Sequence, residues 1–94
     1  MKAELLQRDR FDFDDGVILE MVIWRLPKPL RGSNHSYKYR LFFGRPGTRI
    51  VGYDNENTKG DHRHLEDREE PYPFTDVETL VRDFFEDVAR WRSK

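Results

Sequence analysis

The sequence predicts an α+β fold: an antiparallel sheet of four to five strands with a C-terminal amphipathic helix packed on one face. Three features predict it. Residues 3–65 contain short apolar runs with strand-like alternation, turn residues separate these runs, and residues 75–94 repeat apolar side chains at helical spacing. A chain of 94 residues is long enough for one modest core, so we expect a single domain over residues 1–94.

The first part of the predicted sheet is a hairpin. Phe11 and Phe13 alternate with a charged residue, and the turn signal Asp14-Asp15-Gly16 follows, since glycine accepts the positive φ angle that a tight turn needs. Val17–Leu26 is the strongest predicted strand. It is rich in β-branched residues and apolar on both faces, which indicates a central position in the sheet.

The next predicted strand, Tyr37–Phe43, carries different side chains on its two faces. We expect the helix to cover the face with Leu41 and Phe43, which Tyr37 and Tyr39 share. The opposite face carries Lys38, Arg40 and Phe42. A turn at Gly44–Gly47 then leads into a strand at Thr48–Tyr53.

Two segments are predicted to be irregular. Leu30–Ser36 contains glycine, serine and asparagine, which favours a loop, and its histidine, His35, is expected to be solvated. Glu66–Pro73 is acidic and contains proline, so we expect a surface connection between the sheet and the helix.

The helix has a start signal and an apolar stripe. Thr75 is expected to cap it, because Glu78 stands three residues later and completes a capping box. The stripe predicts the side of the helix that packs on the core, and it consists of Val77, Leu80, Val81, Phe84, Phe85, Val88 and Trp91. The charged residues expected mostly away from it are Arg82, Asp83, Glu86, Asp87 and Arg90.

Charge is unevenly distributed along the chain. Residues 25–63 carry nine basic and three acidic side chains, a net charge of +6, between flanks of −3 and −4. A basic middle can meet phosphate groups, unless the charges of the three segments interleave in space and cancel. The chain has no cysteine, no signal-like N-terminal run and no stretch of about 20 apolar residues, which predicts a cytoplasmic protein without a membrane segment.

Residues 53–64 are the densest in chemically useful groups, with two histidines, an arginine, a lysine and three carboxylates in twelve positions. If Gly60–Glu66 is extended, His62 and His64 share one face and Asp61, Arg63 and Leu65 the other. Two neighbouring imidazoles can act as general acid and general base near neutral pH. Cleavage of RNA by its 2′-hydroxyl needs such a pair, together with cations beside the phosphate.

This stretch supplies the predicted site residues. The catalytic candidates are His62 and His64, with Asp61 either orienting one imidazole or pairing with Arg63. The substrate-binding candidates are the cations Arg40, Arg49, Lys59 and Arg63, together with Tyr53, Asp54 and Glu56. No cofactor or metal is part of this prediction.

Two alternatives use the same residues. His62 and His64, with Asp61, Asp54 or Glu56, could ligate a divalent cation. The stretch could also be a charged loop whose carboxylates pair with Lys59 and Arg63 and do no chemistry.

The stretch also resembles a known family. Tyr53-Asp54-Asn55-Glu56, the run Lys59–His64, Tyr72-x-Phe74 and Leu80-x-x-Asp83-Phe84 are similar, in this order, to the TumE family of bacterial and archaeal toxin–antitoxin proteins. The resemblance extends over residues 49–88. It implies the toxin of a two-gene operon, neutralised by a helix-turn-helix antitoxin.

The leading prediction is therefore a toxin of a toxin–antitoxin system, with RNA as the expected target of its histidines. The alternatives are a non-catalytic module that binds nucleic acid or protein through exposed aromatic residues such as Tyr39 or Phe42, and a metal-dependent phosphodiesterase. We also expect a homo-oligomer or a complex with the antitoxin. The strand at Val17–Trp24 is apolar on both faces, and one helix covers only one of them.

Overall fold

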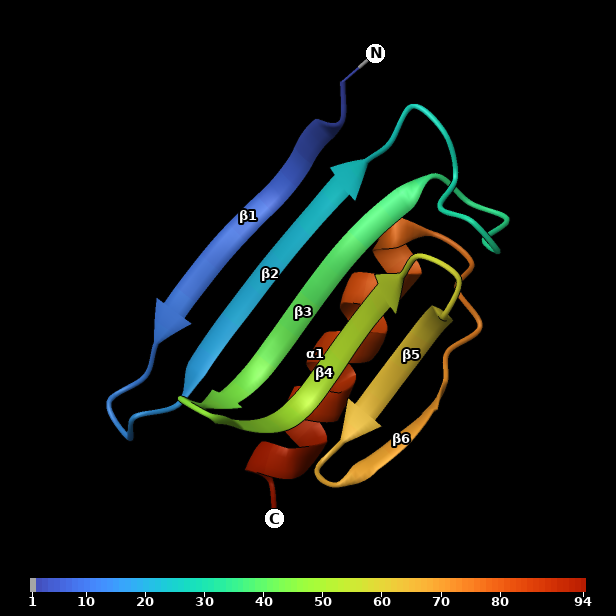
Figure 1. Cartoon of the computed structure of the whole chain (residues 1–94). Coiled ribbons are helices and arrows are strands. Elements are labelled where there is room, and N and C mark those ends of the chain that lie inside the picture. The colour runs from blue at the N-terminus through green and yellow to red at the C-terminus, as the bar shows by residue number, and fades with distance from the viewer. Residues whose placement is uncertain (1) are drawn as a thin grey trace.

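The computed structural model describes residues 2–94 and consists of one antiparallel sheet with one helix across it (Figure 1). The strands lie in the sheet in chain order, so each pairs with its sequence neighbour. The predicted fold class is confirmed, with six strands in place of four to five. The elements are β1 (Glu4–Asp12), β2 (Ile18–Arg25), β3 (Tyr37–Arg45), β4 (Thr48–Glu56), β5 (Gly60–Leu65), β6 (Arg68–Pro71) and α1 (Val77–Arg92).

The additional strand lies in the segment that was predicted to be a surface connection. Leu65 pairs with Arg68, so the chain reverses over two residues and β6 runs back along β5 as an edge strand. Charged residues and a terminal proline are tolerated at a sheet edge, where one side of the strand needs no partner. The composition of the segment therefore concealed a strand.

The pairing register divides the sheet into two faces. One packs against α1 and carries Tyr39, Leu41 and Phe43, as predicted, with Phe43 in edge-to-face contact with Trp91 of the helix. We call it the helix face. No helix covers the other, which we call the open face. The core lies under the helix and consists of Val17, Leu19, Met21, Ile23, Tyr39, Leu41, Phe43, Ile50, Val51, Tyr53, Tyr72, Leu80, Phe84 and Val88.

The helix starts one residue later than predicted. Asp76 is the N-cap, and its carboxylate accepts the backbone N–H of Thr79 at 2.7 Å. The prediction of Thr75 as the cap was wrong, because aspartate and threonine both suit this position and the sequence offers them side by side.

Two residues of the helix lie where the stripe did not place them. Phe84 is fully buried, but Phe85 is 42% exposed, so its assignment to the core was wrong. The two side chains are about 100° apart around the helix axis. Phe85 therefore lies beyond the edge of the helix surface that packs on the sheet. Asp87 was expected away from the core but is only 5% exposed. It faces the hydroxyl of Tyr53 on the sheet.

Asp87 belongs to one of three tyrosine–aspartate hydrogen bonds that join distant parts of the chain. In each, a tyrosine hydroxyl donates to a carboxylate. Burial, followed by the bonded carboxylate and its charge, raises the pKa of each of these tyrosines above its ordinary value. Two of the bonds fix α1 to the rest of the fold. The pairs are Tyr39–Asp61, Tyr53–Asp87 and Tyr72–Asp83.

His35 is not solvated, contrary to the prediction. Its ring stacks on Phe74, with centroids 4.0 Å apart, and its Nε2 lies 2.8 Å from the carboxylate of Asp61. Its Nδ1 accepts the backbone N–H of Tyr37, so the neutral ring carries its proton on Nε2 and donates it to Asp61. This histidine attaches the long β2–β3 loop to β5.

Candidate functional site

The predicted alternation along β5 is confirmed. His62 pairs with Asp54 and His64 with Gly52 of β4, and these four residues belong to the open face. Asp61 and Arg63 belong to the helix face. The two histidines therefore stand beside each other on the side of the sheet that the helix leaves uncovered.

His64 is buried within a small polar cluster on that face. Arg49 Nη2 lies 2.9 Å from Nδ1, and Asp54 Oδ1 lies 3.5 Å from Nε2. Guanidinium can only donate, so Nδ1 accepts and the proton of the neutral ring sits on Nε2, toward Asp54. Nδ1 is thus occupied by Arg49, whose guanidinium His64 positions, whereas Nε2 has the longer contact to Asp54.

Gly52 makes this cluster possible. A Cβ placed at Gly52 would lie 2.4 Å from Cδ of Arg49, far inside van der Waals contact. The stem of Arg49 therefore crosses the sheet over Gly52 and delivers its guanidinium to His64. Glycine is needed at this position because the side chain of Arg49 passes close to the backbone, and any side chain here would displace it.

His62 is the more accessible of the two histidines. Its side chain is 27% exposed, against 11% for His64. Its nearest charged neighbour is Glu69 of β6, with the carboxylate 4.0 Å from Nε2, which is too long for a direct hydrogen bond. His62 can therefore exchange a proton with a bound molecule without first losing a partner.

Cations and aromatic rings extend this face across β2 and β3. Arg40 is exposed, with its guanidinium 5.1 Å from the ring centre of Phe42. In the described part of the chain Glu20, at 4.0 Å, is the acidic side chain that forms an ion pair with it. Trp24 and Phe42 are half-buried. A shallow hollow of about 700 Å³ lies here, and Arg40, Phe42 and Arg49 are among the residues that line it.

Three predicted site residues lie away from this face. Asp61 binds His35 and Tyr39, so it orients neither site histidine. Arg63 pairs with Glu70 at 2.8 Å on the helix face. Tyr53 is completely buried, and its assignment to substrate binding is corrected, because a side chain with no exposed surface cannot touch a substrate.

The remaining candidates, Glu56 and Lys59, lie at the β4–β5 turn. They are exposed and pair with each other at 3.3 Å. Surface pairs of this kind contribute little to stability. The interpretation of the stretch as a self-paired charged loop therefore applies to this turn. The histidines beyond it lie in β5 and belong to the open face.

The residues needed for a metal site do not converge. Within residues 2–94, no group of three or more histidine, cysteine or acidic side chains lies close enough to hold a metal ion. His62 and His64 share a face, but the nearest carboxylates lie 4.0 and 3.5 Å from their ring nitrogens. The carboxylate beside each histidine is a different one, Glu69 for His62 and Asp54 for His64, so the described residues do not gather both imidazoles and a carboxylate at one point.

The sequence did not single out Trp24 or Gly52 as parts of the site. Both lie on strands next to predicted site residues, and only the pairing of four strands brings them together. The alternation already placed Lys38 and Phe42 on the face of Arg40, so the period-two pattern could have found them.

Comparison with protein families places the chain among small toxins. The profile of the family described as Toxin TumE matches residues 2–92. The chain therefore belongs to the TumE family, and the resemblance expected over residues 49–88 extends through the strand-rich first half. Membership in a toxin family implies an antitoxin partner. No curated protein and no solved structure matches the chain. Within residues 2–94, no helix is long and apolar enough to cross a membrane.

Proposed function

We propose that this toxin acts on RNA, which it binds in single-stranded form across the open face, and that His62 exchanges a proton with the bound RNA. One observation carries the proposal: histidines, exposed guanidinium groups and half-buried aromatic rings share the sheet face that no helix of residues 2–94 covers. Such a toxin works in the cytoplasm, where the translated RNA is.

Binding would combine charge and stacking. Arg40 and Arg49 neutralise phosphates, and each neutralised phosphate releases counterions, so affinity falls steeply with salt. Trp24 and Phe42 offer ring surfaces on which unpaired bases stack, at roughly 1–3 kcal/mol per base. Single-stranded RNA presents bases and phosphates together, as this face requires.

The two histidines take different roles in this proposal. His62 has an accessible ring, so it serves as the general acid or base. His64 is buried, and through Nδ1 it holds the guanidinium of Arg49 where charge develops on the phosphate. Asp61 has no part in the chemistry, because its carboxylate is bonded on the opposite face.

The test is induced expression in a bacterial host, with growth and RNA integrity as readouts. His62→Gln keeps the size and polarity of the side chain but cannot transfer a proton, so we expect RNA cleavage to fall by about 10²–10⁴ and growth to recover. The melting temperature should stay at the wild-type value. Arg82→Ala, an exposed cation on the outer side of α1, is the matched control and should remain fully toxic.

A binding module without catalysis is the second candidate. It is favoured by the bond between Arg49 and Nδ1 of the buried His64, and by the hollow, which is lined by Arg40, Phe42 and Arg49 but by neither histidine. In that case His62→Gln remains toxic with intact RNA, whereas Phe42→Ala and Arg40→Ala lose toxicity. The same growth assay therefore separates the two candidates.

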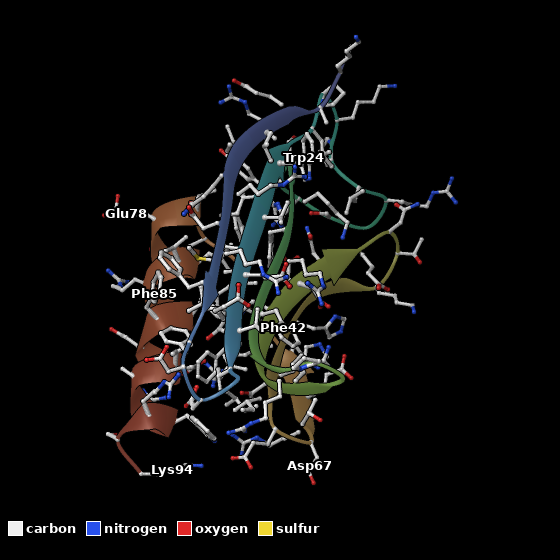
Figure 2. All side chains as sticks on the ribbon, turned by 90° about the vertical axis from the view of Figure 1, so that its left-hand side faces the viewer. Trp24, Phe42, Asp67, Glu78, Phe85 and Lys94 are labelled. Carbon is white, nitrogen blue, oxygen red and sulfur yellow. The ribbon has the colours of Figure 1, made fainter. Side chains whose placement is uncertain are left out.

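We further infer that a helix-turn-helix antitoxin covers the β1 edge. Figure 2 shows this edge toward the viewer, with α1 and Phe85 on one side of the sheet. β1 pairs only with β2, so its other side is unpaired. The exposed large apolar side chains of the described residues all lie on or beside β1 or on the adjoining side of α1; they are Leu5, Leu6, Phe11, Phe13 and Phe85.

The charges of β1 favour a different chain over a second copy at this edge. If two β1 strands paired about a two-fold axis, the residue on the axis would meet its own copy. Arg8, Asp9 and Arg10 occupy the middle of the strand, so the registers centred on them put like charges opposite one another. A homo-oligomer stays a prediction, and the mass of the purified toxin by light scattering tests it.

A further inference from the structure

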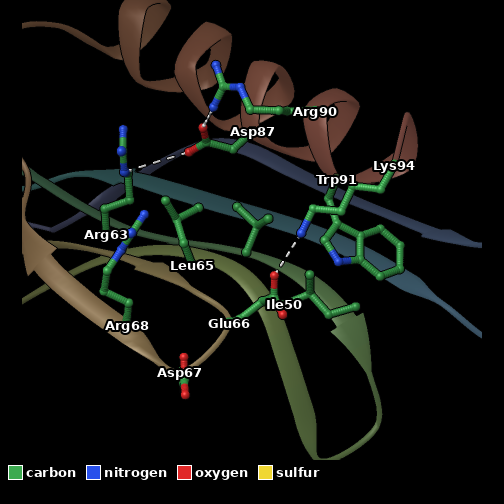
Figure 3. A pocket seen from close by; sticks show the side chains of 11 residues that line it. Ile50, Arg63, Leu65, Glu66, Asp67, Arg68, Asp87, Arg90, Trp91 and Lys94 are labelled. Atoms are coloured by element: carbon green, nitrogen blue, oxygen red, sulfur yellow. Dashed lines mark hydrogen bonds and ion pairs between the residues drawn. The ribbon is translucent and has the colours of Figure 1, made fainter.

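The helix face holds a second candidate site, apart from the histidines. A cavity of about 500 Å³ lies between the last two turns of α1 and strands β4, β5 and β6 (Figure 3). Its volume is within the range of about 300–1,000 Å³ that is typical of small-molecule sites. Leu65 and Trp91, both partly buried, contribute an apolar wall. In Figure 3 the indole of Trp91 lies beside Ile50 and Lys94.

Four cations and three carboxylates surround this apolar wall. Most of the charge is already paired. Asp87 contacts Arg90 at 2.8 Å and Arg63 at 3.8 Å, as the dashed lines in Figure 3 show. Glu66 pairs with Lys94 at 3.0 Å. These charged groups already have partners within the protein, so they need no ligand.

Arg68 is the cation without a partner. In residues 2–94, no acidic side chain forms an ion pair with it, and it is exposed at the start of β6. Asp67, next to it in the chain, is the carboxylate of the lining that forms no ion pair in the same residues. In Figure 3 the side chain of Arg68 points toward that of Arg63. An anionic group that enters here would find the unpaired guanidinium of Arg68 and, nearby, Arg63 and Lys94, which each pair with an exposed carboxylate.

We propose that this cavity binds a nucleotide, with the base against Trp91 and Leu65 and the phosphate at Arg68. A simple anion would leave the apolar wall unused, and an apolar molecule would leave Arg68 without a partner. A nucleotide joins a flat ring to a phosphate and so offers a partner to both parts. The proposal does not need the open face, so its test is independent of the function proposed above.

The chain contains its own reporter for this test. It has two tryptophans, and Trp24 lies on the opposite face of the sheet, so Trp24→Phe leaves Trp91 as the only one. We would titrate this variant with each nucleoside 5′-monophosphate, with the nucleosides and with inorganic phosphate. The expected result is a saturable change in Trp91 fluorescence with a Kd of the order of 0.1 mM for at least one monophosphate.

A matched pair of cation variants tests the role of Arg68. Arg68→Ala should weaken monophosphate binding about tenfold or more and leave nucleoside binding unchanged. Arg82→Ala, which is exposed on α1 outside the cavity, should bind as the parent does. The proposal is overturned if no monophosphate gives a saturable change or if Arg68→Ala binds like the parent. It is also overturned if Trp91 responds to an acidic, aromatic peptide and to no nucleotide.

A competition experiment identifies the source of the nucleotide. A short oligoribonucleotide that displaces the bound monophosphate shows that the cavity takes a residue of an RNA chain. Failure to displace it shows that the cavity takes the free nucleotide. Either result supports the site, because both require the monophosphate to bind first.

Discussion

Arg49 and His64 owe their contact to a residue with no side chain. Gly52→Ala puts a methyl group where Cδ of Arg49 now lies, so we predict that the guanidinium leaves His64. The obstacle is a flexible side chain, so the fold should survive. The loss of one hydrogen bond from a charged donor, partly exposed to water, should cost about 1 kcal/mol of unfolding free energy.

The measurement is a double-mutant cycle between Gly52→Ala and Arg49→Ala, with unfolding free energy and RNA affinity as readouts. If Gly52 acts through Arg49, the double variant is no worse than Arg49→Ala alone. Additive effects would show that Gly52 matters for another reason, such as the backbone of β4.

At the same scale, local periodicity predicted which way the side chains of β5 point and nothing about their partners. His62 and His64 share a face because alternate residues of a strand do. That Asp61 binds His35, 26 residues away, depends on how the β2–β3 loop folds over the sheet. The burial of Tyr53 likewise depends on α1, which the dense stretch itself does not reveal.

Neighbouring phenylalanines of α1 give the sharpest test at the scale of a single element. Phe84 has no exposed surface and contacts the ring of Tyr53, whereas Phe85 is 42% exposed. We predict that Phe84→Ala lowers the unfolding free energy by roughly 3–5 kcal/mol and leaves little folded protein. Phe85→Ala is the same chemical change one residue later and should cost under about 1 kcal/mol. Equal losses in thermal or urea unfolding would reject this orientation of the helix.

Elements with a clear apolar pattern could be predicted from the sequence. Features that depend on a sheet edge or on a buried hydrogen bond could not. The apolar stripe predicted α1, and the β-branched run predicted β2. β6 was missed because an edge strand of four residues can be almost entirely charged. Asp87 lies on the buried side of the helix because Tyr53 supplies a hydrogen bond there, and hydrophobic periodicity cannot register a buried carboxylate.

For the whole molecule, the segment charges interleave only in part. Arg25 and Arg40 of the basic middle pair with Glu4 and Glu20 of the acidic N-terminal part. Arg49 pairs with a histidine instead. Each side of the sheet therefore keeps its own group of cations: guanidinium groups beside the histidines on the open face, and four cations around the cavity on the helix face.

The three tyrosine–aspartate bonds make the stability of the whole fold sensitive to alkali. The pKa of each tyrosine is raised in the folded state, whereas in the unfolded chain it returns to about 10. Below pH 10 both states hold the phenolic protons, and stability should not change through these groups. Above pH 10 the unfolded chain loses its protons first. The unfolding free energy should then fall by up to about 1.4 kcal/mol per pH unit for each tyrosine, or about 4 for the three together.

Urea unfolding at half-unit steps from pH 8 to pH 11.5 measures this slope. To isolate the contribution of each tyrosine, the comparison is between the wild type and single phenylalanine variants. Tyr72→Phe removes one donor, and we predict that it reduces the slope above pH 10 by about 1.4 kcal/mol per pH unit. Its unfolding free energy at neutral pH should fall by about 1 kcal/mol, since Asp83 loses its hydrogen bond.

A variant less stable at pH 8 but with the wild-type slope at pH 11 would show that the Tyr72 hydroxyl ionises as easily in the folded as in the unfolded chain. The hydrogen bond to Asp83 would then contribute nothing to keeping the helix on the sheet in alkali.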